Sequence, residues 1–236
     1  MSDVGQIERK TQRRIVKLFR DTLRYDHLGD WTEREDNRNI EEGYLRSWLE
    51  TRGYGDILIK RALHKLNQAA GDTSKSLYDR NRAVYDLLRY AVKVSPDVGE
   101  KTEDVRLIDW KHPEKNHFAI AEEVTIAGND AKAYGKRPDV VLYVNGIALG
   151  VLELKRSTVS VAEGIRQNLD NQKKVFIERF FSTMQLLMAG NDTEGLRYGS
   201  IETREKYYLT WKEEGAALVS DVAPGFSPAL RPQVPT

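Results

Sequence analysis

Three charged residues adjoin two otherwise apolar segments of the chain. Asp139 precedes the run 140–144, and Glu153 and Lys155 stand at the end of a run that begins at Ile147. Burying such charges is costly unless they are paired or bind a metal ion. Carboxylate oxygens are hard ligands that suit Mg²⁺ or Mn²⁺, and an ammonium group nearby could stabilise charge developing on a phosphate. The three residues therefore favour metal-assisted chemistry on a phosphate ester.

The two apolar runs are joined by Asn145-Gly146. This dipeptide is a strong hairpin signal because both residues tolerate positive φ. We expect an antiparallel hairpin whose open end carries the three charged residues. Residues i and i+2 of a strand share a face, so Glu153 and Lys155 should point to the same side. The alternative is that these two form an ordinary ion pair at a strand end.

The face that Asp139 occupies depends on the length of the hairpin loop. A two-residue loop would place Asp139 opposite Leu152 and direct its carboxylate to the wrong side of the sheet. A three-residue loop, 144–146, would place it opposite Val151 and diagonal to Glu153, with the Cβ atoms about 7 Å apart. Because only the longer loop unites the three residues, we predict a type I turn followed by a left-handed glycine.

The elements that must position these residues are indicated by two different hydrophobic periods. Helical periodicity dominates the first third of the chain, and short runs rich in Val, Ile and Leu follow from about Val105. The predicted helices cover 7–25, 41–51, 57–70, 77–91 and 161–181. The predicted strands cover 118–126, 140–144, 147–154 and 184–188. This order of elements predicts an α/β fold.

The chain has 236 residues, of which 40% are hydrophobic, enough for a substantial core. We expect one domain over 1–220, with a helical N-terminal section over about 1–100 and an α/β core over about 101–220. The remaining residues, 221–236, are rich in proline and are predicted to be a linker or tail. No apolar run approaches the roughly 20 residues of a membrane span, and no signal peptide is evident, so we expect a cytoplasmic protein.

The absence of cysteine excludes disulfides, thiolate catalysis and cysteine-ligated zinc. Lys and Arg number 37 against 36 Asp and Glu, so net charge alone does not indicate a nucleic-acid binder. Cations that flank the three charged residues are the candidates for DNA phosphate contacts. They are Lys136, Arg137, Arg156 and Arg166. The alternative is a solvated surface of mixed charge.

Pro138-Asp139, thirteen intervening residues and Glu153-Leu154-Lys155 resemble the PD-(D/E)xK nuclease signature. The sequences 137–146 and 151–156 are also similar to the amino-terminal region of type I restriction enzyme R subunits. That resemblance extends over almost all of the chain up to about Glu214. It implies a restriction-endonuclease-like fold, a mixed central sheet flanked by helices, and cleavage of duplex DNA with little sequence specificity of its own.

The resemblance also implies roles for particular residues. Asp139, Glu153 and the main-chain carbonyl of Leu154 would bind the metal ion, and Lys155 would be catalytic. Gln167 matches the glutamine of a Gln-x-x-x-Tyr element and would join the catalytic set, but Asn171 stands where that element has tyrosine. An acid on the first helix completes many such sites. Glu8 is the candidate here, and a solvent-facing glutamate is the alternative.

Proteins of this kind contain a helicase-like motor domain in the same polypeptide and work with methyltransferase and specificity subunits. ATP would act only through that motor. The phosphate-binding pattern G-x-x-x-x-G-K-[ST] does not occur in this sequence. We therefore expect a chain that does not translocate DNA by itself, either a fragment that ends before the motor or a truncated product.

Two other functions remain open at this stage. One is a non-catalytic module for DNA binding or assembly on a nuclease fold, against which the intact Asp139, Glu153 and Lys155 argue. The other is a standalone nuclease of repair or recombination, which should lack the long helical section and the proline-rich tail.

Overall fold

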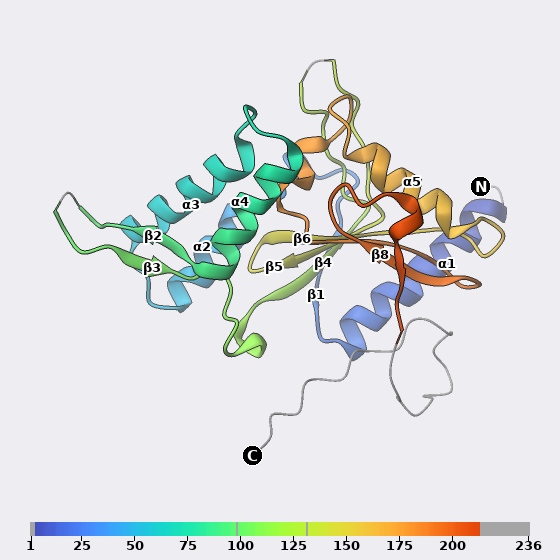
Figure 1. The fold of residues 1–236 in the computed structure, drawn as a ribbon. Helices are drawn as coiled ribbons and strands as arrows, with labels where there is room; N and C mark the ends of the chain where they lie inside the picture. Colours follow the sequence, from blue (N-terminus) through green and yellow to red (C-terminus); the bar gives the residue numbers. More distant parts are fainter. Residues whose placement is uncertain (1–2, 98, 131, 213–236) are drawn as a thin grey trace.

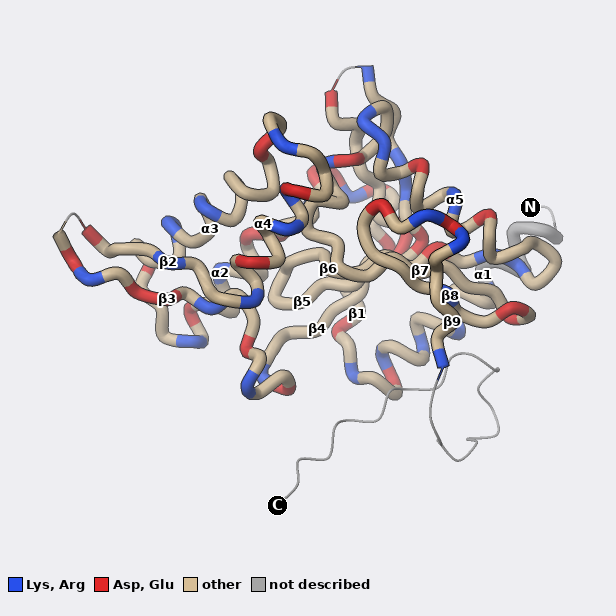
Figure 2. The backbone as a smooth tube through the Cα atoms, viewed as in Figure 1, with Lys and Arg blue, Asp and Glu red and all other residues tan. Residues whose placement is uncertain are grey.

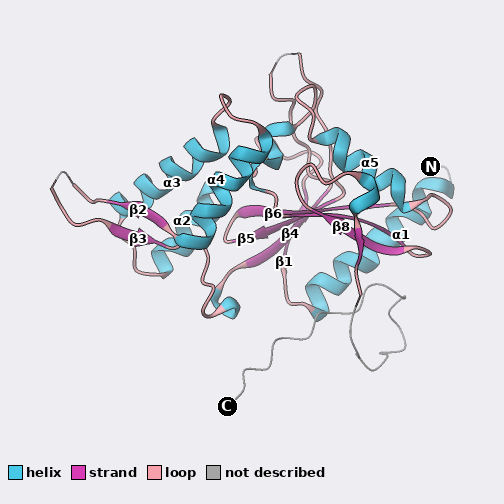
Figure 3. Ribbon diagram, in the orientation of Figure 1, coloured by secondary structure: helices cyan, strands magenta, loops and turns pink. Residues whose placement is uncertain are grey.

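A seven-stranded mixed sheet forms the centre of the molecule in the computed structural model, which describes residues 3–97, 99–130 and 132–212 (Figures 1 and 3). The strands run in the order β1-β4-β5-β6-β7-β8-β9. They are β1 (Asp26–Asp30), β4 (Phe118–Glu122), β5 (Val140–Val144), β6 (Ile147–Leu154), β7 (Leu186–Asn191), β8 (Gly195–Gly199) and β9 (Leu209–Thr210). The pairs β1–β4 and β6–β7 are parallel and the other neighbours are antiparallel.

Five α-helices and a small second sheet accompany the central sheet in the described part of the chain. The helices are α1 (Asp3–Lys17), α2 (Glu42–Thr51), α3 (Asp56–Gly71), α4 (Leu77–Tyr90) and α5 (Val161–Asn171). The second sheet pairs β2 (Val92–Val94) with β3 (Glu103–Val105). The predicted α/β, restriction-endonuclease-like fold with flanking helices is confirmed.

The two faces of the central sheet bury different side chains, as strand alternation requires. Val141 and Val151 pack on the face covered by α5. Val140 and Leu152, their immediate neighbours in sequence, pack on the face covered by α1. Figure 1 shows these two helices on opposite sides of the sheet. Because a one-residue change of register exchanges the faces, the pairing of β5 with β6 decides which residues α5 covers.

Helices α2, α3 and α4 share a separate core with β2 and β3, beside one end of the central sheet (Figure 1). Ile147 of β6 belongs to this core and thus joins it to the sheet. A second link is the guanidinium of Arg80 on α4, which is buried and lies 2.7 Å from the Glu178 carboxylate. The N-terminal section is therefore held to the sheet by apolar contact and to the segment before β7 by a buried ion pair.

Several predicted boundaries were wrong. The helix predicted over 161–181 ends at Asn171, because the backbone at Val175 and Phe176 hydrogen-bonds to Tyr134 and Asn129 instead of continuing the helix. A short 3₁₀ helix, Glu178–Thr183, follows. The first hundred residues are not wholly helical either, since β1 lies at the edge of the central sheet.

The strand predicted over 118–126 ends at Glu122, because Glu123 adopts a φ of 49° and turns the chain. The strand predicted over 184–188 instead covers Leu186–Asn191. The predicted tail, 221–236, and the predicted domain end at 220 lie outside the described residues. Within the described ranges, no helix is both long and apolar enough to cross a membrane.

Candidate active site

The loop of the β5–β6 hairpin contains only two residues, so the predicted three-residue loop was wrong. Val144 pairs directly with Ile147, and Asn145 and Gly146 between them have φ values of 53° and 81°. These are the positive values that a two-residue hairpin turn requires. A Cβ on Gly146 would lie 2.7 Å from the carbonyl oxygen of Glu41. Glycine is therefore required both by the turn and by the close approach of the N-terminal section.

An extra residue in β6, and not the length of the loop, provides the register that puts Asp139 and Glu153 on one face of the sheet. Tyr143 pairs with Ala148 but Leu142 pairs with Gly150, which leaves Leu149 as a β-bulge. Such a bulge shifts every later pair by one residue. Beyond it Val140 pairs with Leu152, and the next position toward the open end sets Asp139 against Glu153. The two acids thus share a face, as predicted, but lie directly opposite each other and not on a diagonal.

The carboxylate of Asp139 is held against the end of β6. Its Oδ2 accepts a hydrogen bond of 2.7 Å from the backbone N–H of Leu154. The carbonyl oxygen of Asp139 in turn accepts a 2.9 Å hydrogen bond from the N–H of Glu123, the residue that follows β4. The end of β6 therefore holds the side chain of Asp139, and the segment after β4 holds its backbone.

Glu153 is fully buried, and within the described part of the chain neither of its carboxylate oxygens has a hydrogen-bond partner. Burial raises the pKa of this carboxyl well above its ordinary value, and the nearby Asp139 carboxylate raises that pKa further. The Lys155 ammonium opposes the rise in pKa. A buried carboxylate without compensation is costly, and a bound cation would remove most of that cost.

Helix α5 places Gln167 beside Lys155. The Lys155 ammonium donates a hydrogen bond of 2.7 Å to Oε1 of Gln167. The helix can approach the sheet because residue 164 is glycine: a Cβ there would lie 3.0 Å from the Cβ of Ala189 and 3.5 Å from that of Glu153. Ser160 caps the helix, accepting a hydrogen bond from the N–H of Ala162.

Asn171 lies one turn beyond Gln167 on α5 and is buried. Both polar atoms of its amide have no hydrogen-bond partner among the residues that the structure describes. Where the Gln-x-x-x-Tyr element has tyrosine, this chain thus has the shorter, buried amide side chain of Asn171.

Glu123 is a residue of this site that the sequence analysis missed. Its carboxylate contributes to the raised pKa of Glu153, although the two residues are 30 positions apart. Its Oε2 also lies 2.9 Å from Nε of Arg137. The available signal was an acidic pair, Glu122 and Glu123, directly after an apolar run, but only the placement of β4 beside β5 reveals its relevance.

The predicted DNA-contacting cations are dispersed, and three of the four contact other side chains. Lys136 lies 3.8 Å above the ring centre of Phe176, and Arg137 pairs with Glu123. Arg166 pairs with Glu163 and Glu205, and Arg156 is half-buried just after β6. Figure 2 shows basic and acidic residues interspersed around α5. Their role in DNA binding stays a prediction.

The donor atoms at this site fit a hard divalent ion. Asp139 and Glu153 supply carboxylate oxygens on one face of the hairpin, and those of Glu153 lack partners in the described structure. Within the described residues there is no cluster of three or more His, Cys, Asp or Glu side chains that could hold a metal ion. The main-chain carbonyl of Leu154 therefore remains a predicted third ligand. Glu8 belongs to α1, but its side chain lies outside the described ones.

Comparison with known proteins gives one consistent result. The family profile described as type I restriction enzyme R protein N terminus matches residues 6–206. The type I restriction enzyme HindI endonuclease subunit of Haemophilus influenzae is 31% identical over 139 residues, which are 56% of this chain and 13% of that protein. The EcoprrI endonuclease subunit of Escherichia coli is 25% identical over 128 residues, 52% of this chain and 40% of that protein. The chain thus spans less than half the length of either relative.

Proposed function

The chain belongs to the family of type I restriction enzyme R protein N-terminal regions, and from this premise we propose that it is a metal-dependent endonuclease domain. Its substrate would be the phosphodiester bonds of duplex DNA, cut with little sequence specificity of its own. The observation that carries the proposal is the buried carboxylate of Glu153, which faces Asp139, adjoins Lys155 and has no hydrogen-bond partner among the described residues. A structural ion pair would leave no such carboxylate in need of a cation.

Each residue has a distinct part in this proposal. Bound between the carboxylates of Asp139 and Glu153 and the carbonyl of Leu154, Mg²⁺ or Mn²⁺ would neutralise phosphate charge and lower the pKa of a water molecule. Lys155 has three N–H donors, of which Gln167 accepts one, so the others remain for a phosphate oxygen. The backbone of Leu154 holds Asp139 in place before DNA binds.

The flanking cations would bind the DNA backbone. Arg137 would exchange the Glu123 carboxylate for a phosphate, and Arg166 would release its exposed carboxylate partners in the same way. Exposed ion pairs are worth about 0–1 kcal/mol, so the exchange is not costly. Lys136 and Arg156 complete the proposed set.

We infer that the domain works within a larger protein and complex, because the matched region is 13% of the HindI subunit. A helicase-like motor in the same polypeptide would use ATP, and methyltransferase and specificity subunits would select the site. The proposed location is the cytoplasm, where the DNA substrate is.

Plasmid cleavage tests this function. An R subunit that contains this domain would be assembled with its partner subunits and given ATP, Mg²⁺ and a supercoiled plasmid carrying the recognition site. Asp139→Ala, Glu153→Ala and Lys155→Ala should each lower the cleavage rate at least about a hundredfold while ATP hydrolysis continues, since each removes charge stabilisation of the transition state. Asp170→Asn, an exposed change on α5, is the matched control. Equal cleavage by all five proteins would exclude the proposal.

A second measurement does not depend on the partner subunits. Calorimetry measures the binding of Mn²⁺ to the chain. Asp139→Ala and Glu153→Ala should each abolish this binding. It should persist in Lys155→Ala, which removes a positive charge and no ligand. Unchanged Mn²⁺ binding in the two acid variants would place the ion elsewhere.

A further inference from the structure

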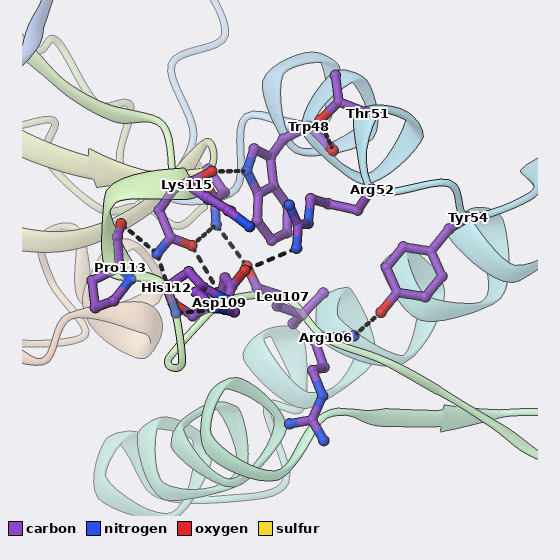
Figure 4. Close-up of polar contacts among 12 residues, drawn as sticks. Trp48, Thr51, Arg52, Tyr54, Arg106, Leu107, Asp109, His112, Pro113 and Lys115 are labelled. Carbon is purple, nitrogen blue, oxygen red and sulfur yellow. Dashed lines mark hydrogen bonds and ion pairs between the residues drawn. The ribbon is translucent and has the colours of Figure 1, made fainter. Parts of the chain in front are cut away.

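A pocket of about 600 Å³ lies in the N-terminal section, away from the candidate active site. It is formed where α2 and α4 meet the segment that follows β3, and Figure 4 shows its polar contacts. The lining residues are Trp48, Arg52, Tyr54, Arg89, Arg106, Asp109, Trp110, Lys111 and His112. None of them has a part in the proposed nuclease chemistry.

The first notable feature of this pocket is an excess of positive charge. Four of the nine lining residues are Arg or Lys, and Asp109 is the one acid among the nine. Asp109 is already engaged, since its Oδ2 lies 2.8 Å from the Arg52 guanidinium and its Oδ1 accepts a hydrogen bond from the N–H of His112. The pKa of Asp109 is lowered, first by that backbone hydrogen bond and then by the charge of Arg52. It therefore stays ionised and neutralises a single cation.

Arg89, Arg106 and Lys111 are the remaining cations, and all three are exposed. Within the described ranges none of their side chains pairs with a carboxylate. The backbone at Arg106 is nevertheless fixed, because its N–H donates a 3.0 Å hydrogen bond to the Tyr54 hydroxyl. In Figure 4 its guanidinium extends away from the other residues drawn. Fixed backbone with extended cations is a suitable arrangement for binding phosphates.

The second feature is a set of aromatic rings beside these cations. Trp110 is 49% exposed, and its indole N–H is already bonded to the carbonyl oxygen of Leu88 at 2.8 Å. The guanidinium of Arg89 lies 5.8 Å from the Trp110 ring centre. The indole therefore presents apolar surface next to a cation and offers no free donor. Such a surface can stack on a planar base, the contact that sequence-tolerant single-strand binders use.

We propose that this pocket binds a segment of single-stranded DNA, with phosphates at Arg106 and Lys111 and an unpaired base stacked on Trp110. Bases inside a duplex cannot reach a ring in this way, which favours an unpaired strand. The volume of about 600 Å³ lies within the range of ligand-sized pockets. This binding activity is additional to the proposed nuclease function and does not depend on it.

The position of the pocket separates it from the cleavage site. The carbonyl oxygen of Leu107, between two lining residues, accepts a 2.9 Å hydrogen bond from the Asn145 side chain at the turn of the β5–β6 hairpin. Asp139 and Glu153 lie at the open end of the same hairpin. The eight residues of β6 span roughly 25 Å, at about 3.3 Å per residue. The pocket and the active site are therefore distinct sites at the two ends of one hairpin.

The test measures binding of a fluorescein-labelled, 12-nucleotide oligothymidylate by anisotropy, with the chain in EDTA so that cleavage does not contribute. Arg106→Gln/Lys111→Gln should weaken binding about tenfold at 0.1 M salt. It should also reduce the slope of log affinity against log salt by about 1.4, as expected for two lost phosphate contacts. Lys60→Gln/Lys75→Gln, which removes the same charge from exposed lysines outside the pocket, should stay within about twofold of wild type.

Stacking is tested separately from charge. Trp110→Ala should weaken binding about tenfold, whereas Trp110→Phe, which keeps an aromatic face, should lose only about threefold. Both variants lose the indole hydrogen bond to Leu88, so thermal unfolding should show a similar small loss of stability in each, and the difference in binding between them reports on stacking. Affinities in the pocket variants equal to those of the lysine control would overturn the proposal. So would a 12-base-pair duplex whose affinity falls in the pocket variants as much as that of the single strand, since the duplex has its own proposed site beside Asp139 and Glu153, or polyglutamate that competes as well as unlabelled oligothymidylate.

Discussion

The ammonium of Lys155 donates a hydrogen bond of 2.7 Å to Oε1 of Gln167 and so connects the end of β6 to the middle of α5. Lysine is a flexible point charge on a four-carbon stem, and an acceptor on a packed helix restricts where that charge can lie. We propose that Gln167 positions the amine, a part that resemblance alone left undefined.

Gln167→Leu should lower the plasmid cleavage rate of the assembled enzyme about tenfold with little change in KM for DNA. The substitution keeps the size of the side chain but removes the acceptor, so the amine is less well oriented. Asp170→Asn on the same helix is the control, and single-turnover cleavage is the measurement. A changed KM with an unchanged rate would mean that Gln167 binds DNA and does not position Lys155.

Glu153→Gln should stabilise the protein in the absence of divalent ions, and more so as pH rises. The folded state raises the pKa of Glu153 above 4.5, so the folded protein holds this proton more tightly than the unfolded chain. The resulting stability is present in full below the ordinary pKa and is lost as pH rises through the folded-state pKa. Glu153→Gln has no carboxyl group to ionise at this position, so it does not lose this stability as pH rises.

Thermal unfolding in EDTA checks this prediction. At pH 8 the Tm of Glu153→Gln should exceed that of wild type by about 2–4 °C, the shift expected for about 1 kcal/mol in a chain of this size. At pH 4.5 the two values should converge. Mn²⁺ should raise the Tm of wild type only. A variant less stable than wild type at pH 8 would show that the carboxylate is compensated within the protein.

Glu123→Gln should weaken Mn²⁺ binding about fivefold, because it removes a negative charge that acts on Glu153. Glu202→Gln is the matched control: it makes the same charge change at a residue that also has positive φ, 58° against 49°. Calorimetry of Mn²⁺ binding distinguishes the two variants. Equal Mn²⁺ affinities would remove Glu123 from the site.

Gly164→Val should destabilise the fold by about 1–3 kcal/mol and lower cleavage as well. Its side chain would meet Ala189 and Glu153, so α5 must move away from the sheet and take Gln167 with it. Gly71→Ala, where a Cβ meets nothing within 4 Å, should be neutral or slightly stabilising. Urea unfolding measures both. Normal stability of Gly164→Val would show that the close packing of α5 is dispensable.

Local sequence determined the elements that carry the site. The bounds of β5 and β6 and the start of α5 at Val161 agree with prediction, because continuous apolar runs, an Asn145-Gly146 turn and a serine cap act over a few residues. The union of Asp139 with Glu153 on one face was also predicted, although for a wrong reason.

Tertiary structure decided how that union is achieved and what surrounds it. The bulge at Leu149 was not predicted. Gly150 beside it is a local signal for a bulge, but packing on both faces of the sheet decides the register. The place of Glu123 beside the site depends on β4 pairing with β5, a contact between distant segments. The pocket around Trp110 likewise joins α2, α4 and the segment after β3. Periodicity reports which face a residue occupies, but only long-range packing decides which faces meet.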